Sequence, residues 1–195
     1  FKAAGFRHTQ CQNNGQDLRF QSSSGSELKY EIAKWNQSGK SIIWLNVPTL
    51  IRNDKIFMRW GNSNISSPSY VTDGSAWSNY LAVYHLDQDE GVAAPDSGPH
   101  HNHATIGFTG SNPIKSNISK IGGSFEFGKN QNRDFRNESV TGTMTLDDFT
   151  LSGWIRGTVN DAQDWYDYYG INTTNGGQLR FEANNQNPPR IHVHG

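Results

Sequence analysis

The chain has 195 residues, of which 33% are hydrophobic and 12% are aromatic, and it contains 20 glycines and six tryptophans. Its formal net charge of −1 excludes the strongly basic surface that binding to nucleic acid or to anionic membranes requires. No run of 18 apolar residues occurs, which excludes direct insertion into a membrane through an apolar helix. Many glycines and large rings are typical of thin β-sheet cores, so we expect an all-β protein.

Short apolar runs alternate with clusters of Gly, Asn, Ser and Pro, a pattern that predicts antiparallel strands. Residues 17–20 and 28–32 show a period of two on either side of a turn at 22–26, which predicts a hairpin. Further strands are expected over residues 41–47, 55–60, 80–86, 124–127, 148–156, 165–170, 178–182 and 190–194.

Residues 61–75 are polar and contain Pro68, which is typical of a linker, although a long loop inside one domain has the same composition. We place a domain boundary after this segment. Residues 1–76 are then expected to form a first β-sandwich module and residues 77–195 a second one.

The first module resembles a bacterial extracellular family known only as domain of unknown function 2341. The matching segments are DLRF (17–20), LKYEI (28–32), WN (35–36), IWLNVP (43–48) and FMRWGN (57–62). The resemblance implies a β-sandwich and an extracellular setting, and it assigns no activity.

The second module resembles a laminin-G or concanavalin-A-like jelly roll. The matching segments are AVYHL (82–86), DSG (96–98), IGGSFEF (121–127) and FTLSGWI (149–155). Together the two resemblances imply two antiparallel β-sandwich modules in tandem, with both ends of the pair truncated. We expect the missing strands to lie in further chain or to come from a neighbouring subunit by strand addition.

One loop carries oxygen and imidazole ligands that suit a metal ion. Asp96, Asn102 and Asp134 are the candidates for a calcium site, since calcium takes carboxylate, amide and carbonyl oxygens from loops. The histidines at 100, 101 and 103 have poor spacing for zinc. The structural alternative is that Asp96 caps a turn through its own backbone.

Aromatic rings gather in the segment 164–169, where Trp165, Tyr166 and Tyr168 are the candidates for a sugar-binding platform. Strict alternation along a strand argues that some of these rings face a core instead, with Trp165 and Tyr169 on one face and Tyr166 and Tyr168 on the other. The remaining tryptophans expected in the core are Trp35, Trp44, Trp60 and Trp154.

Catalytic motifs are lacking in the sequence. The concanavalin-A-like glycoside hydrolases need two carboxylates on one strand face, whereas Asp147 and Asp148 are adjacent and so alternate between faces. No Gly-x-Ser-x-Gly elbow or phosphate-binding glycine loop occurs, and Cys11 has no reactive sequence context. We expect no enzymatic activity within these residues.

These features favour a non-catalytic recognition or adhesion module of a larger extracellular or cell-surface protein, binding carbohydrate or another cell-surface ligand. Two alternatives stay open. The chain is a structural subunit or spacer of an extracellular fibre completed by strand exchange, or it is the accessory part of a secreted polysaccharide-degrading enzyme. Expected partners are a glycan or cell-surface ligand and other domains or subunits of the parent protein.

Overall fold

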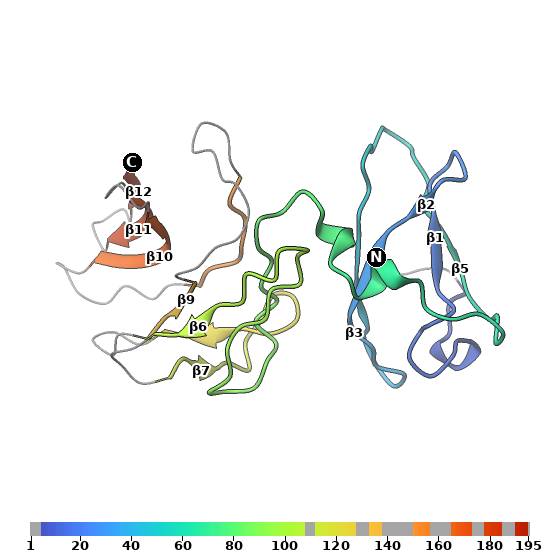
Figure 1. The fold of residues 1–195 in the computed structure, drawn as a ribbon, viewed down its shortest axis with the longest axis horizontal. Helices are drawn as coiled ribbons and strands as arrows, with labels where there is room; N and C mark the ends of the chain where they lie inside the picture. The colour runs from blue at the N-terminus through green and yellow to red at the C-terminus, as the bar shows by residue number, and fades with distance from the viewer. Residues whose placement is uncertain are drawn as a thin grey trace. The chain divides into compact units, whose positions relative to one another are not determined.

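A computed structural model describes residues 5–107, 112–127, 133–137 and 150–156, and the backbone of the strands at 165–172, 178–184 and 190–194. These residues form antiparallel strands and three 3-10 turns, with no α-helix among them, which confirms the all-β prediction (Figure 1). Two compact units are present, Phe1–Asp148 and Phe149–Gly195, and each is described by itself. The boundary predicted after residue 76 falls inside the first unit and stays a prediction.

Five strands and one 3-10 turn make up the first part of the first unit. The turn is η1 (His8–Gln10), and the strands are β1 (Arg19–Gln21), β2 (Glu27–Leu28), β3 (Tyr30–Lys34), β4 (Ile42–Leu45) and β5 (Phe57–Arg59). They form a sheet of order β2-β1-β5 and a separate pair β3-β4. The predicted hairpin is confirmed, because Phe20 pairs with Leu28 across the turn. The strands predicted over 41–47 and 55–60 are also found, as β4 and β5.

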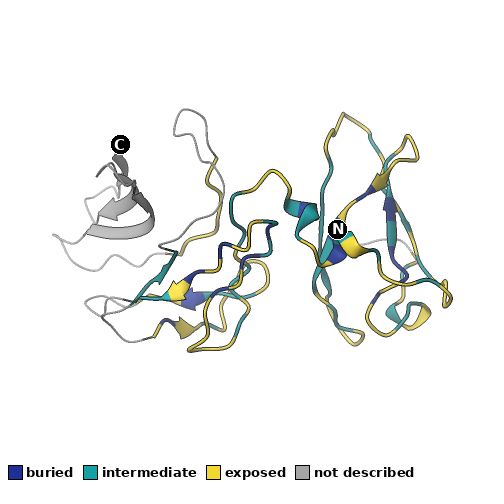
Figure 2. Ribbon diagram, in the orientation of Figure 1, coloured by how far each residue is buried: buried dark blue, intermediate teal, exposed yellow. Residues whose placement is uncertain are grey.

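A small apolar core joins these two sheets. The most buried members are Leu18, Phe20, Leu28, Tyr30 and Val71, with exposed fractions from 0% to 8%. Figure 2 shows buried positions along β1. The hydroxyl of Tyr30 donates a 2.6 Å hydrogen bond to the carbonyl oxygen of Leu18, so the largest buried ring also satisfies its polar end. Burial of each such side chain contributes about 1.5–3 kcal/mol.

Asp17 fixes the loops next to this core. Its carboxylate is almost fully buried and accepts hydrogen bonds from the backbone N–H of Gln12 at 2.8 Å and of Gly61 at 2.6 Å. A buried carboxylate is tolerated only when donors of this kind replace water. Asp17 therefore connects the loops at Gln12 and at Gly61 to each other, just before the start of β1.

The rest of the first unit has little regular structure. It contains η2 (Ser69–Val71), η3 (Ser75–Trp77), β6 (Thr105–Ile106), β7 (Ile114–Lys115), β8 (Phe125–Glu126) and β9 (Phe135–Arg136), with β6 paired to β9 and β7 to β8. The strand predicted over 124–127 is found as β8. The strand predicted over 80–86 is wrong, because this segment makes one isolated bridge, Tyr84 to Asp96, and Leu86 has a φ of 55°, which ends extended pairing.

The second unit contains an antiparallel sheet of order β10-β11-β12. Its strands are β10 (Trp165–Asn172), β11 (Gln178–Asn184) and β12 (Arg190–His194), as the period of two predicts. A bulge lies between Asp167 and Tyr169, which pair with Glu182 and Phe181 respectively. Tyr168 is therefore the additional residue, and the strict alternation expected along this strand does not hold.

The four tryptophans that were predicted to lie in the core do not all lie there. Trp35 and Trp60 are partly buried and contact the apolar core, as predicted. Trp44 is partly buried but shares a strand face with Glu31, described below. Trp154 is 70% exposed, so its assignment to the core is wrong. Residues 150–156 form no strand, so alternation of side chains between two faces of a sheet does not predict which of them are buried.

Gly74 is the clearest backbone constraint, and it generates a test. It has a φ of 78°, and a Cβ atom there would lie 2.6 Å from the carbonyl carbon of Gly98. Gly74→Ala should therefore lower the free energy of unfolding through both left-handed strain, about 1–2 kcal/mol, and steric overlap. Gly25 is the matched control, because its φ is 85° and nothing lies within 4 Å of the position that a Cβ atom would take there.

Urea denaturation of both variants measures the difference. We expect Gly74→Ala to cost at least about 1 kcal/mol more than Gly25→Ala. Equal losses in the two variants would contradict the close contact between Gly74 and the backbone at Gly98.

Candidate functional site

The pairing of β3 with β4 creates a polar face next to the core. Glu31 pairs with Trp44, while the neighbouring pair Ile32 and Ile43 lies on the core side. A bulge between Ile32 and Lys34 inserts one residue, so Lys34 pairs with Ile42 and shares the face of Glu31 and Trp44. Without the bulge, Lys34 would fall on the opposite face.

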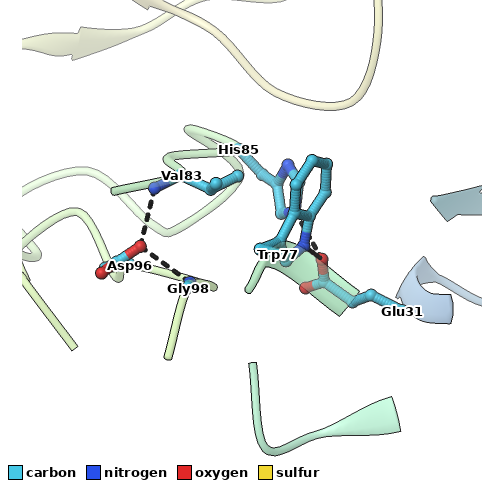
Figure 3. A network of polar contacts seen from close by, with 6 residues as sticks. All are labelled: Glu31, Trp77, Val83, His85, Asp96 and Gly98. Carbon is cyan, nitrogen blue, oxygen red and sulfur yellow. Dashed lines mark hydrogen bonds and ion pairs between the residues drawn. The ribbon is translucent and has the colours of Figure 1, made fainter. Parts of the chain in front are cut away.

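The carboxylate of Glu31 is the centre of this face. Its Oε2 atom accepts a hydrogen bond from the indole N–H of Trp77 at 2.5 Å and contacts Nε2 of His85 at 2.9 Å (Figure 3). The His85 and Glu31 side chains are only 13% and 18% exposed. These contacts connect β3 to residues 46 and 54 positions further along the chain.

The hydrogen bonds decide the charge of Glu31. Burial by itself raises the pKa of this carboxyl group, but hydrogen bonds from His85 and Trp77, with the attraction of His85, outweigh burial and lower the pKa below its ordinary value of 4.5. Glu31 is therefore ionised at neutral pH. Because an ionised carboxylate carries no proton, Nε2 of His85 must be the donor in their hydrogen bond.

The two rings that contact the Glu31 carboxylate also pack against the ring of Trp44. Trp44 and His85 stack with an angle of 8° and centroids 5.6 Å apart, and the Trp77 centroid lies 5.5 Å from that of Trp44. The indole N–H of Trp44 is buried and has no hydrogen-bond partner among the described residues.

A cleft with a volume of about 160 Å³ lies beside these rings. Its lining combines aromatic, aliphatic and charged side chains with two glycines: Ala33, Lys34, Ile42, Trp44, His85, Asp87, Lys115, Ile121, Gly122 and Gly123. Gly123 permits a close approach, since a Cβ atom there would lie 1.9 Å from the carbonyl oxygen of Leu86. Lys115 is fixed by hydrogen bonds from its Nζ atom to the carbonyl oxygens of Asp87 and Gln88, at 2.7 and 2.6 Å.

The structure brings together two of the three residues predicted to bind calcium. Oδ1 of Asp96 accepts hydrogen bonds from the backbone N–H of Val83 at 2.7 Å and of Gly98 at 2.8 Å (Figure 3). Its Oδ2 atom accepts one from the backbone N–H of Asn102 at 2.8 Å, and the Asn102 side chain donates to the carbonyl of Leu81. Asp96 therefore caps its own turn, as the structural alternative predicts, and also holds the loop against residues 81–83.

Asp134, the third predicted ligand, has other partners in the first unit. It forms an ion pair with Arg136, and its backbone carbonyl accepts a hydrogen bond from the N–H of Gly107. Within the part of the chain that the structure describes, no three His, Cys, Asp or Glu side chains lie close enough to hold one metal ion. Calcium binding by Asp96, Asn102 and Asp134 stays a prediction.

Asp96 also contacts His103, in the loop that carries three histidines, through its backbone. The backbone N–H of Asp96 donates a 3.0 Å hydrogen bond to Nδ1 of His103. That ring nitrogen is therefore an acceptor, and the proton of neutral His103 lies on Nε2. This contact gives His103 a structural role.

The predicted sugar platform lies on β10 of the second unit. Trp165 and Tyr166 pair with Asn184 and Ala183, and Tyr168 lies at the bulge. Their side chains are outside the described residues, so the platform stays a prediction. The pairing alone shows that Tyr166 and Tyr169, and not Trp165 and Tyr169, occupy positions on one face.

Nucleophilic chemistry finds little support in the described side chains. Burial and the nearby Asp17 carboxylate raise the pKa of the Cys11 thiol to about 11, so little thiolate forms at neutral pH. None of the hydrogen bonds between described residues joins His85 to a serine, threonine or cysteine.

Sequence reasoning did not identify Glu31, Trp77 or His85 as a site. Glu31 lies between Tyr30 and Ile32 in a strand, where a carboxylate is normally expected to face solvent. The available signal was the presence of one acidic residue and one histidine inside two of the matching segments, LKYEI and AVYHL. The cleft depends on the bulge after Ile32, which alternation does not reveal.

Residues 14–94 match the family described as Domain of unknown function (DUF2341), which confirms the resemblance of the first module. The match covers less than half of the chain and includes Glu31, Trp77 and His85. No curated protein and no solved structure has significant similarity to the chain. The resemblance of residues 77–195 to a laminin-G or concanavalin-A-like domain stays a prediction. Within the described ranges, no helix has the length and apolar character needed to cross a membrane.

The depressed pKa of Glu31 predicts acid sensitivity. Its contribution to stability is fully present above pH 4.5 and is lost as the pH falls through the lower value of the folded chain. Glu31→Gln should lower the free energy of unfolding at pH 7 by about 1–3 kcal/mol and should flatten the acid limb of the stability profile. Urea denaturation from pH 7 to pH 3 measures both effects.

Glu27→Gln is the control for this variant. Glu27 is exposed and accepts a hydrogen bond from the Tyr70 hydroxyl. The amide oxygen of a glutamine at this position can accept the same hydrogen bond. We expect a loss below about 0.5 kcal/mol for this surface substitution. An acid limb that is unchanged in Glu31→Gln would contradict the charge assigned to Glu31.

Calcium binding is tested by thermal unfolding. A site at Asp96, Asn102 and Asp134 predicts stabilisation by about 1.4 kcal/mol when calcium is present at ten times its Kd, seen as a rise in Tm. The rise should shrink in Asp134→Asn and be absent with magnesium chloride at the same ionic strength. An unchanged Tm of the unmodified chain in calcium would contradict the prediction of a calcium site.

Proposed function

We propose that this chain is a non-catalytic recognition module of a larger extracellular or cell-surface protein, and that it binds carbohydrate or another cell-surface ligand. The observation that supports this proposal is the cleft beside Trp44 and His85. It combines stacked rings with the charged residues Lys34, Asp87 and Lys115, the mixture of flat apolar faces and hydrogen-bonding groups that recognises polar ligands.

The size of the cleft narrows the ligand class. Pockets for drug-sized molecules have volumes of roughly 300–1,000 Å³. A cleft of about 160 Å³ suits a single sugar ring, or one group of a longer chain that lies across the surface.

The second unit adds a further surface to the proposal. Residues 77–195 are proposed to belong to a jelly roll of the laminin-G or concanavalin-A-like type, in tandem with the module formed by residues 1–76. Trp165, Tyr166 and Tyr168 are the candidates for a second ligand platform. Because Trp165 and Tyr166 occupy opposite faces of the sheet, only one of these two residues can belong to a given face. Neighbouring domains or subunits of the parent protein are the other proposed partners.

Binding to a glycan array tests this function. Lys34 lines the cleft, so Lys34→Ala should weaken binding about 10-fold, the effect of losing one good polar contact. Lys40→Ala is the matched control, because Lys40 is an exposed lysine in the β3–β4 connection and does not line the cleft. Circular dichroism of each variant checks folding.

The same array separates the two surfaces. Loss of binding in Trp165→Ala, Tyr166→Ala or Tyr168→Ala, with binding by Lys34→Ala unaffected, would place recognition on the second unit. It would exclude the cleft as the ligand-binding site. Absence of binding to any glycan or cell-surface preparation would contradict the proposal. Ordered filaments in electron micrographs would favour the alternative role as a fibre subunit.

A further inference from the structure

The sheet of the second unit has two chemically distinct faces, which follow from its strand pairing. Apolar positions share one face: Tyr166, Tyr169, Ile171, Leu179, Phe181, Ala183, Ile191 and Val193. The other face carries Trp165, Asp167, Gly170, Asn172, Gln178, Arg180, Glu182, Asn184, Arg190, His192 and His194. The bulge at Tyr168 makes this division complete, because it moves Tyr169 and Ile171 onto the apolar face.

Metal-ligating residue types are aligned on the polar face. Glu182, on the central strand β11, pairs with Asp167 on one side and with His192 on the other. His194 lies two positions beyond His192 on β12, and so on the same face. Directly paired residues in antiparallel strands have Cβ atoms about 4.5–5.5 Å apart, and diagonal neighbours lie about 7–8 Å apart.

We propose that the row of residues Asp167, Glu182, His192 and His194 on the polar face is a binding site for one divalent transition metal ion. Two imidazoles and a carboxylate form a ligand set that zinc accepts in tetrahedral sites, and zinc is the ion that we assign. Two histidines separated by one residue on β12, with a carboxylate residue directly across on β11, place three metal-ligating residue types on one face of the sheet.

The bulge that divides the faces also lies beside this row of residues. It follows Asp167 immediately, in the one strand of this sheet whose pairing shifts. Bulges occur frequently beside functional sites, where they alter the position of a neighbouring residue. Here the bulge lies next to the residue that completes the row of ligands.

Two arginines on the same face suggest an alternative role for its carboxylates, in ion pairs and not in metal binding. Arg180 pairs with His194, and Arg190 pairs with Asn184. If their charges served only to neutralise Glu182 and Asp167, the face would be an ordinary polar surface with cross-strand ion pairs. Such a surface would not bind one equivalent of zinc.

The test uses the full chain without an affinity tag, titrated with zinc chloride in a calorimeter. We expect one equivalent to bind, and cobalt to give the visible absorption of a tetrahedral site. His192→Gln and Glu182→Gln should each weaken zinc binding by at least about 100-fold, since loss of even an outer-shell partner costs 10–100-fold. His101→Asn is the matched control and should bind as the unmodified chain does.

His101 is a suitable control because it lies in the other histidine-rich segment and has a φ of 52°, which asparagine tolerates. Loss of binding in His101→Asn with retention in His192→Gln would overturn the proposal, as would absence of binding in the unmodified chain. Circular dichroism verifies that each variant is folded. If His192→Gln does not fold, Glu182→Gln decides alone, and unchanged zinc affinity in it overturns the proposal.

Discussion

The first unit depends on the burial of an ionised carboxylate, Glu31. A charge at this depth is stable only when donors replace its lost water, and the chain supplies these from Trp77 and His85. Since both donors lie far along the sequence, satisfying one carboxylate fixes the whole segment 77–86 against the pair β3-β4. The stacking of His85 on Trp44 and the cleft beside them follow from that attachment.

Two further buried carboxylates, those of Asp17 and Asp96, are also stabilised by hydrogen-bond donors of the chain. Asp17 and Asp96 are 2% and 5% exposed. Each accepts hydrogen bonds from several backbone N–H groups, of which those of Gly61 and Val83 lie 44 and 13 positions away. Much of the first unit after β5 consists of two-residue strands and isolated bridges, which supply few ladder hydrogen bonds. Buried aspartates that bind several backbone donors compensate for this by fixing the loops to one another.

The sequence allowed the strands with regular alternation to be predicted, but not their irregularities. The hairpin β1–β2, the strands β4 and β5, and the sheet β10-β11-β12 follow from a period of two. The segment around Leu86 has the same apolar content but adopts a positive φ, a consequence of tertiary contacts that local pattern does not record. The exposed Trp154 shows the same limit, because size and apolar character do not determine burial outside a strand.

The candidate site was less predictable for a specific physical reason. Bulges at Ala33 and Tyr168 each change which residues share a face, and a single inserted residue reverses the alternation beyond it. Lys34 reaches the face of Trp44 in this way. Asp96, by contrast, was predicted to act either as a turn cap or as a calcium ligand, and its turn-capping contact to the N–H of Gly98 is visible in the structure.

A double-mutant cycle on Glu31 and Trp77 tests the central claim most directly. The variants Glu31→Ala and Trp77→Phe, singly and combined, remove the carboxylate and the indole N–H while keeping an aromatic ring at position 77. We expect a coupling energy of at least about 1 kcal/mol in the free energy of unfolding at pH 7, within the range for contacting residues. Additive losses, with a coupling energy near zero, would show that Glu31 does not hold residues 77–86 to the sheet.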